Sequence, residues 1–318
     1  MFRVAVPSPQ AERTGWVDSP REGILSEMIT LVSWNIAKRH QPWRDLVSMG
    51  DVDVALLQEA GRVPPDLGDR VWLGPESHYD SHRWNSRWFE GRYPRLLDRW
   101  PMVALLSDRV RVEWFQQVSP ISEVRANEIA VSGIGTIAAA RVVPLDSDTQ
   151  PFIAVSMYAR WMRPHPSTRS KWRVGAPDGS AHRIISDLSA FIGDTDPSSH
   201  RIIAAGDLNM AYKLPPDRPE SFAERERTVF ARMEALGMEL MGPRYPNGRP
   251  AAPPPEPPHD PRNVPTYHSS QRDPATAEHQ LDYVFASRGF HESVSVRALN
   301  SVEDWGSSDH CRIVIEVD

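Results

Sequence analysis

Nine short runs rich in valine and isoleucine recur along the chain, and each is bounded by Gly, Pro, Asp or Ser. Runs of this length and composition between turn-forming residues are typical of β-strands. Several are apolar on both faces, as in sheets covered on one side by a second sheet and on the other by helices. The pattern predicts a layered α/β sandwich. The nine runs are residues 28–37, 53–60, 102–107, 136–145, 151–159, 201–209, 279–287, 293–299 and 311–317.

Two segments between these runs carry apolar residues at helical spacing. In residues 180–194 the apolar stripe contains Ile184, Ile185, Leu188, Phe191 and Ile192. Residues 220–238 carry a second stripe. Both patterns predict amphipathic helices that pack against a sheet.

The distribution of these elements predicts one domain over residues 28–318. Residues 1–27 are polar and contain several prolines, so we expect a loose N-terminal arm, and Met28 is a conceivable functional start. Residues 242–265 are rich in proline and predict an exposed loop with polyproline-type conformation. Strands of the same character continue after this loop, which we therefore interpret as an insertion.

Charge and cysteine content exclude several classes of protein. A net charge of −6 and a pI near 6.0 argue against a protein that coats nucleic acid by bulk electrostatics, although a local basic groove is compatible with them. The single cysteine, Cys311, excludes an internal disulfide framework, and we expect it in the core. No apolar segment is long enough to cross a bilayer. We expect a soluble cytoplasmic protein without a membrane or an obligate protein partner.

Polar residues gather where these apolar runs end. Any one of them has an ordinary explanation as a turn or helix-cap residue. Together they are costly to bury without partners, which favours convergence on each other or on a cation. Oxygen ligands favour Mg²⁺, whereas zinc requires more His or Cys. The polar set contains Asn35, Gln58, Glu59, Tyr158, Arg160, Asp207, Asn209, Asp282, Asp309 and His310.

The ordered motifs "WN", "QE", "GDLN", "LDYVFAS" and "SDH" resemble the endonuclease/exonuclease/phosphatase superfamily, over about residues 29–318. The resemblance implies a four-layer α/β/β/α sandwich with an active site at one end of the paired sheets. It also implies a metal-dependent phosphoric ester hydrolase that uses Mg²⁺, with Mn²⁺ as an alternative.

The resemblance implies a role for each motif residue. Glu59 would be the main metal carboxylate, with Asn35 and Asp309 completing or supporting the metal site. Asp207 would orient or deprotonate the attacking water, and Asn209 would hold the phosphate. His310 would bind the scissile phosphate and be oriented by Asp282, while the Tyr158 hydroxyl would neutralise developing charge. The segment "YARW" matches the tyrosine branch of the superfamily but lacks the Pro-Asn usual in abasic-site enzymes.

Two basic, aromatic segments are expected to line the substrate face. Arginine beside flat aromatic rings suits single-stranded or distorted nucleic acid, although the same residues also pack as a lid over a core. We predict a nuclease acting on DNA or RNA. The alternatives are a phosphatase or phosphodiesterase for a small phosphorylated ligand, such as a nucleotide, inositol phosphate or lipid headgroup, and a non-enzymatic binder. The substrate-binding candidates are Arg83, Trp84 and Arg87 in residues 79–100, and Arg160, Trp161 and Arg163 in residues 160–175.

Five other histidines lack metal-ligand spacing and are predicted to be surface or loop residues. Thr266 and Tyr267 resemble a family segment that shapes the pocket, and no chemistry is assigned to them. The five histidines are His78, His82, His165, His182 and His268.

Overall fold

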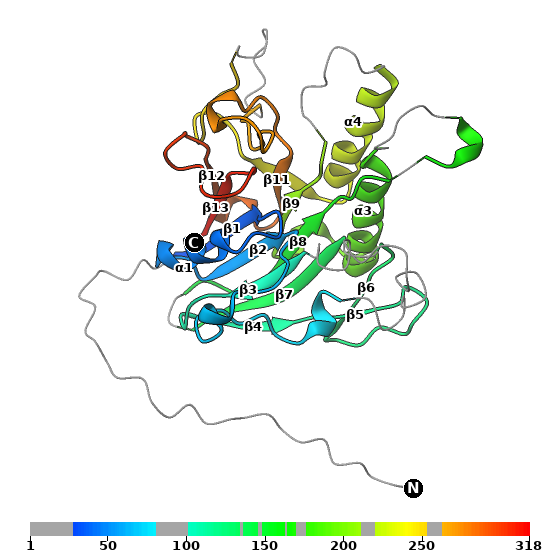
Figure 1. Ribbon diagram of the computed structural model, residues 1–318. Coiled ribbons are helices and arrows are strands. Elements are labelled where there is room, and N and C mark those ends of the chain that lie inside the picture. Colours follow the sequence, from blue (N-terminus) through cyan, green and yellow to red (C-terminus); the bar gives the residue numbers. More distant parts are fainter. Residues whose placement is uncertain are drawn as a thin grey trace, which may run out of the picture.

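The computed structural model describes residues 28–80, 101–133, 136–145, 148–162, 164–169, 176–210, 220–252 and 263–318; for 220–222 it describes the backbone alone. Two large mixed sheets pack face to face and carry helices on their outer faces (Figure 1). This arrangement confirms the predicted α/β sandwich. Among the described residues, no helix has the length and apolar character that crossing a membrane requires.

The first sheet has the strand order β12–β13–β1–β2–β3. β1 and β2 run parallel, and the other neighbours are antiparallel. Its strands are β1 (Ile29–Asn35), β2 (Val54–Gln58), β3 (Met102–Leu105), β12 (Val294–Leu299) and β13 (Arg312–Val317).

The second sheet has the order β10–β11–β9–β8–β7–β4, in which only β8 and β9 are parallel neighbours. A separate parallel pair is formed by β5 (Gln116–Val118) and β6 (Glu128–Ala130). The strands of the second sheet are β4 (Val110–Trp114), β7 (Ile137–Pro144), β8 (Phe152–Tyr158), β9 (Ile202–Asp207), β10 (Met238–Gly242) and β11 (Asp282–Ser287).

Three apolar clusters separate the four layers. The largest lies between the sheets, a second lies between the second sheet and helices α3 (Asp178–Ile192) and α4 (Glu220–Ala235), and a third lies between the first sheet and α1 (Gln41–Met49). The side chains of a strand alternate between its two faces. In β1, Ile29 and Leu31 therefore face the second sheet, and Val32 and Trp34 face α1.

All nine predicted strand segments contain a strand, and both predicted helices are present. The second helix ends earlier than expected. α4 stops at Ala235, Gly237 takes a left-handed φ of 79°, and Met238 begins β10. Glycine adopts this conformation without steric cost, which allows the chain to turn from helix into strand.

Two sequence-based expectations are wrong. His78 lies in the short 3₁₀ helix Glu76–His78 and is fully buried instead of being a surface or loop residue. The proline-rich segment is not exposed along its length, because Val264 packs in the core between the sheets and Asn263 is buried. Its residues 253–262 lie outside the described part of the chain. Cys311 is buried in the core as predicted.

Candidate active site

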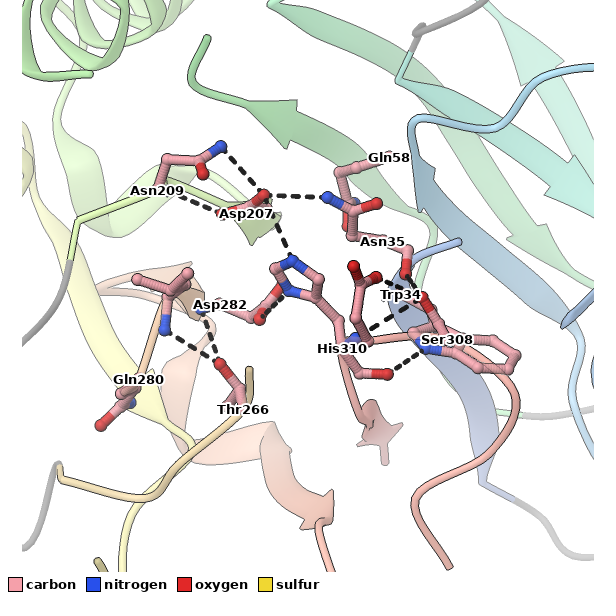
Figure 2. Close-up of polar contacts among 12 residues, drawn as sticks. Trp34, Asn35, Gln58, Asp207, Asn209, Thr266, Gln280, Asp282, Ser308 and His310 are labelled. Carbon is pink, nitrogen blue, oxygen red and sulfur yellow. Dashed lines mark hydrogen bonds and ion pairs between the residues drawn. The ribbon is translucent and has the colours of Figure 1, made fainter. Parts of the chain in front are cut away.

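The inter-sheet core becomes polar at one end, and this end forms the candidate site (Figure 2). On β9, Ile203 and Ala205 face the core between the sheets, so the alternation brings Asp207 to the same face. The same alternation applies to Asn35 after Leu31 and to Asp282 before Val284. The polar ends come together because β8, β9 and β11 are neighbours: Asp207 pairs in register with both Tyr158 and Asp282.

Asp207 is the most heavily hydrogen-bonded carboxylate of the site and is 1% exposed. Its Oδ1 accepts from the backbone N–H of Asn209 at 2.7 Å. Its Oδ2 accepts from Nδ2 of Asn35 at 2.9 Å, across the gap between the two sheets, and from Nδ2 of Asn209 at 3.0 Å. Asn209 holds a φ of 52°, a value that Asn tolerates better than most residues. These donors stabilise the ionised carboxylate and fix its orientation.

His310 and Asp282 form a buried pair beside Asp207. Nδ1 of His310 lies 2.8 Å from Oδ2 of Asp282, and Nε2 lies 3.9 Å from Oδ2 of Asp207. The backbone of His310 is also fixed, because its carbonyl accepts from Nε1 of Trp34 at 2.8 Å. The carboxylate of Asp282 holds the imidazole in one orientation and leaves Nε2 facing the site.

The pKa values of this group are strongly perturbed. Burial raises the pKa of Asp207 to about 7, while His310 opposes this shift and Asp282 adds to it. Burial by itself lowers the pKa of His310, but Asp282 and Asp207 outweigh it and raise that pKa to about 10. The raised pKa favours the imidazolium form of His310, in which both nitrogens carry a proton.

Glu59 lies immediately after β2. Its Oε1 accepts a hydrogen bond of 2.6 Å from the Tyr158 hydroxyl. Burial and the nearby Glu59 and Asp207 carboxylates raise the pKa of Tyr158 well above its ordinary value, so the phenol stays protonated. Gln58 is fully buried and donates to Oγ of Ser156 at 3.0 Å, which is a further contact between the sheets.

Asp309 lies at the edge of the site with 19% of its side chain exposed. Its Oδ1 lies 3.2 Å from Oγ of Ser308, and its Oδ2 is 3.9 Å from Nη2 of Arg39. The Ser308 hydroxyl donates its proton to the backbone carbonyl of Asn35, at 2.7 Å. The loop before β13 is thus fastened to the end of β1, which keeps Asp309 near Asn35.

Thr266 and Tyr267 support the His310–Asp282 pair. Oγ1 of Thr266 accepts from the backbone N–H groups of Leu281 and Asp282 at 2.9 and 3.1 Å. The centre of the Tyr267 ring lies 5.0 Å from the centre of the His310 ring. The sequence marked Gln58 and Ser308 only as members of the motifs "QE" and "SDH", and Thr266 only as part of a pocket-shaping segment. It could not predict their contacts, because their partners are distant in the chain.

The substrate-binding candidates are only partly described. Arg160 and Trp161 follow β8 at the rim of the site, and Nε1 of Trp161 donates to Oδ1 of Asn209 at 2.8 Å. The guanidinium of Arg160 lies 5.7 Å from the centre of the Tyr158 ring. Arg83, Trp84, Arg87 and Arg163 lie outside the described residues, as does His82.

Two groups of residues are candidates for holding a metal ion. Asp207, Asp282 and His310 each offer a ligand atom, and these atoms lie within 4.8 Å of one another. A metal bound there would require the imidazole of His310 to be neutral. Glu59, Asn35 and Asp309 offer oxygen atoms only, the donor type that Mg²⁺ prefers. The fold brings the ligand atoms of the first group together, whereas the second group is a candidate by its donor type.

The model of the Endonuclease/Exonuclease/phosphatase family matches residues 32–310. No sequence among curated proteins matches the chain. Among solved structures, AP endonuclease LMAP from Leishmania major has a TM-score of 0.58 at 18% identity, covering 95% of this chain and 92% of its own. The catalytic domain of Xenopus laevis APE2 has a TM-score of 0.54 at 16% identity, covering 90% and 91%. An AP endonuclease from Archaeoglobus fulgidus has a TM-score of 0.51 at 13% identity, covering 91% and 99%. At these identities the likeness shows the shared fold.

Proposed function

The chain belongs to the endonuclease/exonuclease/phosphatase family and is a phosphoric ester hydrolase; from this premise we propose that it is a Mg²⁺-dependent nuclease that hydrolyses phosphodiester bonds in DNA or RNA. The observation that carries the proposal is the position of Asp207 between two amides and beside the His310–Asp282 pair. The proposal includes a single catalytic domain over residues 28–318, a loose arm over residues 1–27 and a cytoplasmic location.

In this proposal Asp207 orients a water molecule for in-line attack on phosphorus. Asn35 and Asn209 donate to the carboxylate and hold it in one orientation. A fixed carboxylate keeps the water aligned and accepts its proton as the new bond forms. The pKa of Asp207, raised to about 7, suits a general base that works near neutral pH.

His310 binds the scissile phosphate in this proposal. The imidazolium donates from Nε2 to a phosphoryl oxygen, while Nδ1 remains bonded to Asp282. A buried cation at this position stabilises the negative charge that builds on the phosphoryl group during attack. The Tyr158 hydroxyl orients Glu59.

Glu59, Asn35 and Asp309 would hold Mg²⁺, with Mn²⁺ as an alternative. When bound there, the ion would supply positive charge to the phosphoryl oxygens and to the leaving group. The oxygen-only donors of these residues support this assignment, and the Tyr158 hydroxyl orients Glu59 by a hydrogen bond.

The proposed substrate is nucleic acid. The basic and aromatic residues after β8, Arg160 and Trp161, support it, and Arg83, Trp84, Arg87 and Arg163 extend the proposed contact surface. The printed names of the structural neighbours also describe enzymes that act on nucleic acid: AP endonucleases and the endonuclease domain of a telomere-specific retrotransposon. A small phosphorylated ligand is the alternative substrate.

The test is a substrate panel with Mg²⁺ that contains plasmid DNA, single-stranded DNA, RNA, a nucleotide and an inositol phosphate. Asp207→Asn and His310→Ala should each lower cleavage of nucleic acid by about 10²- to 10⁴-fold. Asp187→Asn is the matched control, because Asp187 is a buried carboxylate on α3 that accepts from the Ser132 backbone, away from the site. If the wild-type protein leaves all the nucleic acids intact, the proposed nuclease activity is refuted. Cleavage of the small ligands alone would establish the alternative, a hydrolase of small phosphorylated ligands.

A further inference from the structure

Trp161 connects the exposed rim of the site to Asp207 through one intervening side chain. The residue is 37% exposed. Its indole Nε1 donates to Oδ1 of Asn209 at 2.8 Å. Nδ2 of Asn209 in turn donates to Oδ2 of Asp207 at 3.0 Å. Two hydrogen bonds therefore link an exposed aromatic ring to the carboxylate that orients water.

The carboxamide of Asn209 uses its whole donor capacity in this arrangement. One N–H group goes to Asp207 and the other goes to the backbone carbonyl of Ala159, at 3.0 Å in each case. A carboxamide has two N–H donors. No N–H group of this side chain is left for a phosphate, which favours a positioning role for Asn209 over direct phosphate binding.

The indole determines which way the carboxamide of Asn209 faces. An indole N–H can donate but cannot accept, so it selects the carbonyl end of the amide. If the amide were reversed, its oxygen would face the Asp207 carboxylate, and two acceptors would repel each other. Donation to Oδ1 also polarises the amide and strengthens the hydrogen bonds that its N–H groups make.

The backbone on both sides of Trp161 is anchored. The N–H group of Arg160 donates to Oγ of Ser180 on α3 at 3.0 Å. Met162 forms an antiparallel bridge with Ala176, with N–H···O distances of 3.1 Å in both directions. The indole is therefore presented from a fixed segment, as a positioning role requires.

We propose that Trp161 positions Asp207 through Asn209, and that its exposed face stacks against a base of the nucleic acid strand bound beside the site. The inference rests on the proposed function and adds that binding of the strand is coupled to the position of Asp207. A strand that engages the indole also holds the hydrogen-bonded chain to Asp207 in its working geometry. Stacking on an aromatic ring tolerates any base, so this contact favours a strand with an accessible base over paired duplex.

Two substitutions separate the two roles. Trp161→Phe keeps an aromatic face but removes the N–H donor, whereas Trp161→Ala removes both. Trp114→Phe is the matched control, because Nε1 of Trp114 donates to the Val103 carbonyl at 2.8 Å in a partly exposed position unrelated to Asn209. The assays are steady-state cleavage of a short fluorescein-labelled single-stranded DNA with Mg²⁺, and anisotropy binding of its phosphorothioate analogue without metal.

We expect Trp161→Phe to lower kcat by roughly 10-fold or more and to leave KM and metal-free binding within about 3-fold. Trp161→Ala should also weaken metal-free binding by at least about 5-fold, because the stacking surface is lost. Trp114→Phe should change neither kcat nor binding. Unchanged kcat in Trp161→Phe overturns the positioning role, and unchanged binding in Trp161→Ala overturns the stacking role.

A second measurement does not depend on activity. In protein labelled with [¹⁵N]asparagine, the side-chain amide signals of Asn209, assigned with Asn209→Gln, should shift in Trp161→Phe and stay in place in Trp114→Phe. Unshifted signals in Trp161→Phe refute the connection even if the wild type cleaves DNA. A wild type that cleaves no nucleic acid refutes the proposed function, while a shift of the Asn209 signals would still establish the contact.

Discussion

The Tyr158 hydroxyl donates a hydrogen bond of 2.6 Å to Oε1 of Glu59. Tyr158 ends β8 in the second sheet and Glu59 follows β2 in the first, so this bond joins the two sheets at the active end. Glu59 has a φ of 47°, which a residue other than glycine holds only where its surroundings fix it. Tyr158 is one of the groups that fix the Glu59 carboxylate.

Tyr158→Phe should raise the Mg²⁺ concentration that the reaction requires. The substitution removes the hydrogen bond that orients Glu59, and losing such a supporting bond typically costs about 10- to 100-fold in metal affinity or activity. The measurement is the Mg²⁺ concentration that gives half-maximal cleavage. Tyr79→Phe is the control, because Tyr79 is a partly buried tyrosine that packs on His78. Equal Mg²⁺ dependence in wild type and Tyr158→Phe would contradict the assignment of Glu59 to the metal.

Asp282→Asn should lower kcat/KM by about 10²- to 10⁴-fold, because His310 loses the carboxylate that orients it and favours its charged form. Asp178→Asn is the matched control: Asp178 is a buried carboxylate paired with Arg225 at the helical layer. Both variants should lose stability in urea unfolding, but only Asp282→Asn should lose activity. Similar losses of activity in both would indicate that the effect of Asp282 is structural.

The strands of the fold were predictable from the sequence because those of the core are apolar and bounded by turn residues. β4, β5, β6 and β10 were not predicted. β4 alternates buried valines with exposed Arg111 and Glu113, β5 and β6 are three residues each, and β10 is half-buried. α1 spans nine residues with a proline at its start, too short to give a clear helical period.

The candidate site was predictable as a set of residues but not as a set of contacts. Asn35 and Asp207 are 172 positions apart, and their hydrogen bond depends on how the two sheets stack. The contact between Trp161 and Asn209 depends in the same way on the path of the chain after β8. The positions of the strand ends therefore predict which residues lie close together. The pairing of the strands and the packing of the two sheets determine which atoms form hydrogen bonds.

Gly206→Ala should destabilise the protein by at least about 2 kcal/mol. Gly206 has a φ of 153°, and an added Cβ would lie 1.9 Å from the carbonyl oxygen of Met157 on the neighbouring strand. Gly68→Ala is the control, because its Cβ would meet only the Pro65 carbonyl at 3.6 Å. Urea unfolding measures both. An unfolding midpoint for Gly206→Ala equal to that of the wild type would show that β8 and β9 can move apart without loss of stability.

His78 is a fully buried histidine, and its surroundings explain why it was wrongly expected at the surface. Nδ1 lies 2.8 Å from the carbonyl of Pro75, and Nε2 accepts from the backbone N–H of Val103 at 3.4 Å. The ring also packs against Tyr79 and Trp114. Both nitrogens have a hydrogen-bond partner when the ring is neutral, so His78 packs in this part of the core as a hydrophobic residue would.

The stability of the protein should fall between pH 6.5 and pH 4 in part because of His78. Burial lowers its pKa from 6.5 to about 4, and the bond to Pro75 only partly opposes this shift. Between these values the unfolded chain binds a proton that the folded protein does not, so lowering the pH favours unfolding; above pH 6.5 neither state binds it, and below pH 4 both do. The loss of stability that His78 contributes at pH 5 is about 2 kcal/mol.

Urea unfolding at pH 7 and pH 5 should therefore show a smaller effect of pH on stability in His78→Gln than in the wild type. The control His165→Gln, at an exposed position, should behave as the wild type does. If His78→Gln keeps the full wild-type difference, carboxylates elsewhere in the fold account for the acid sensitivity.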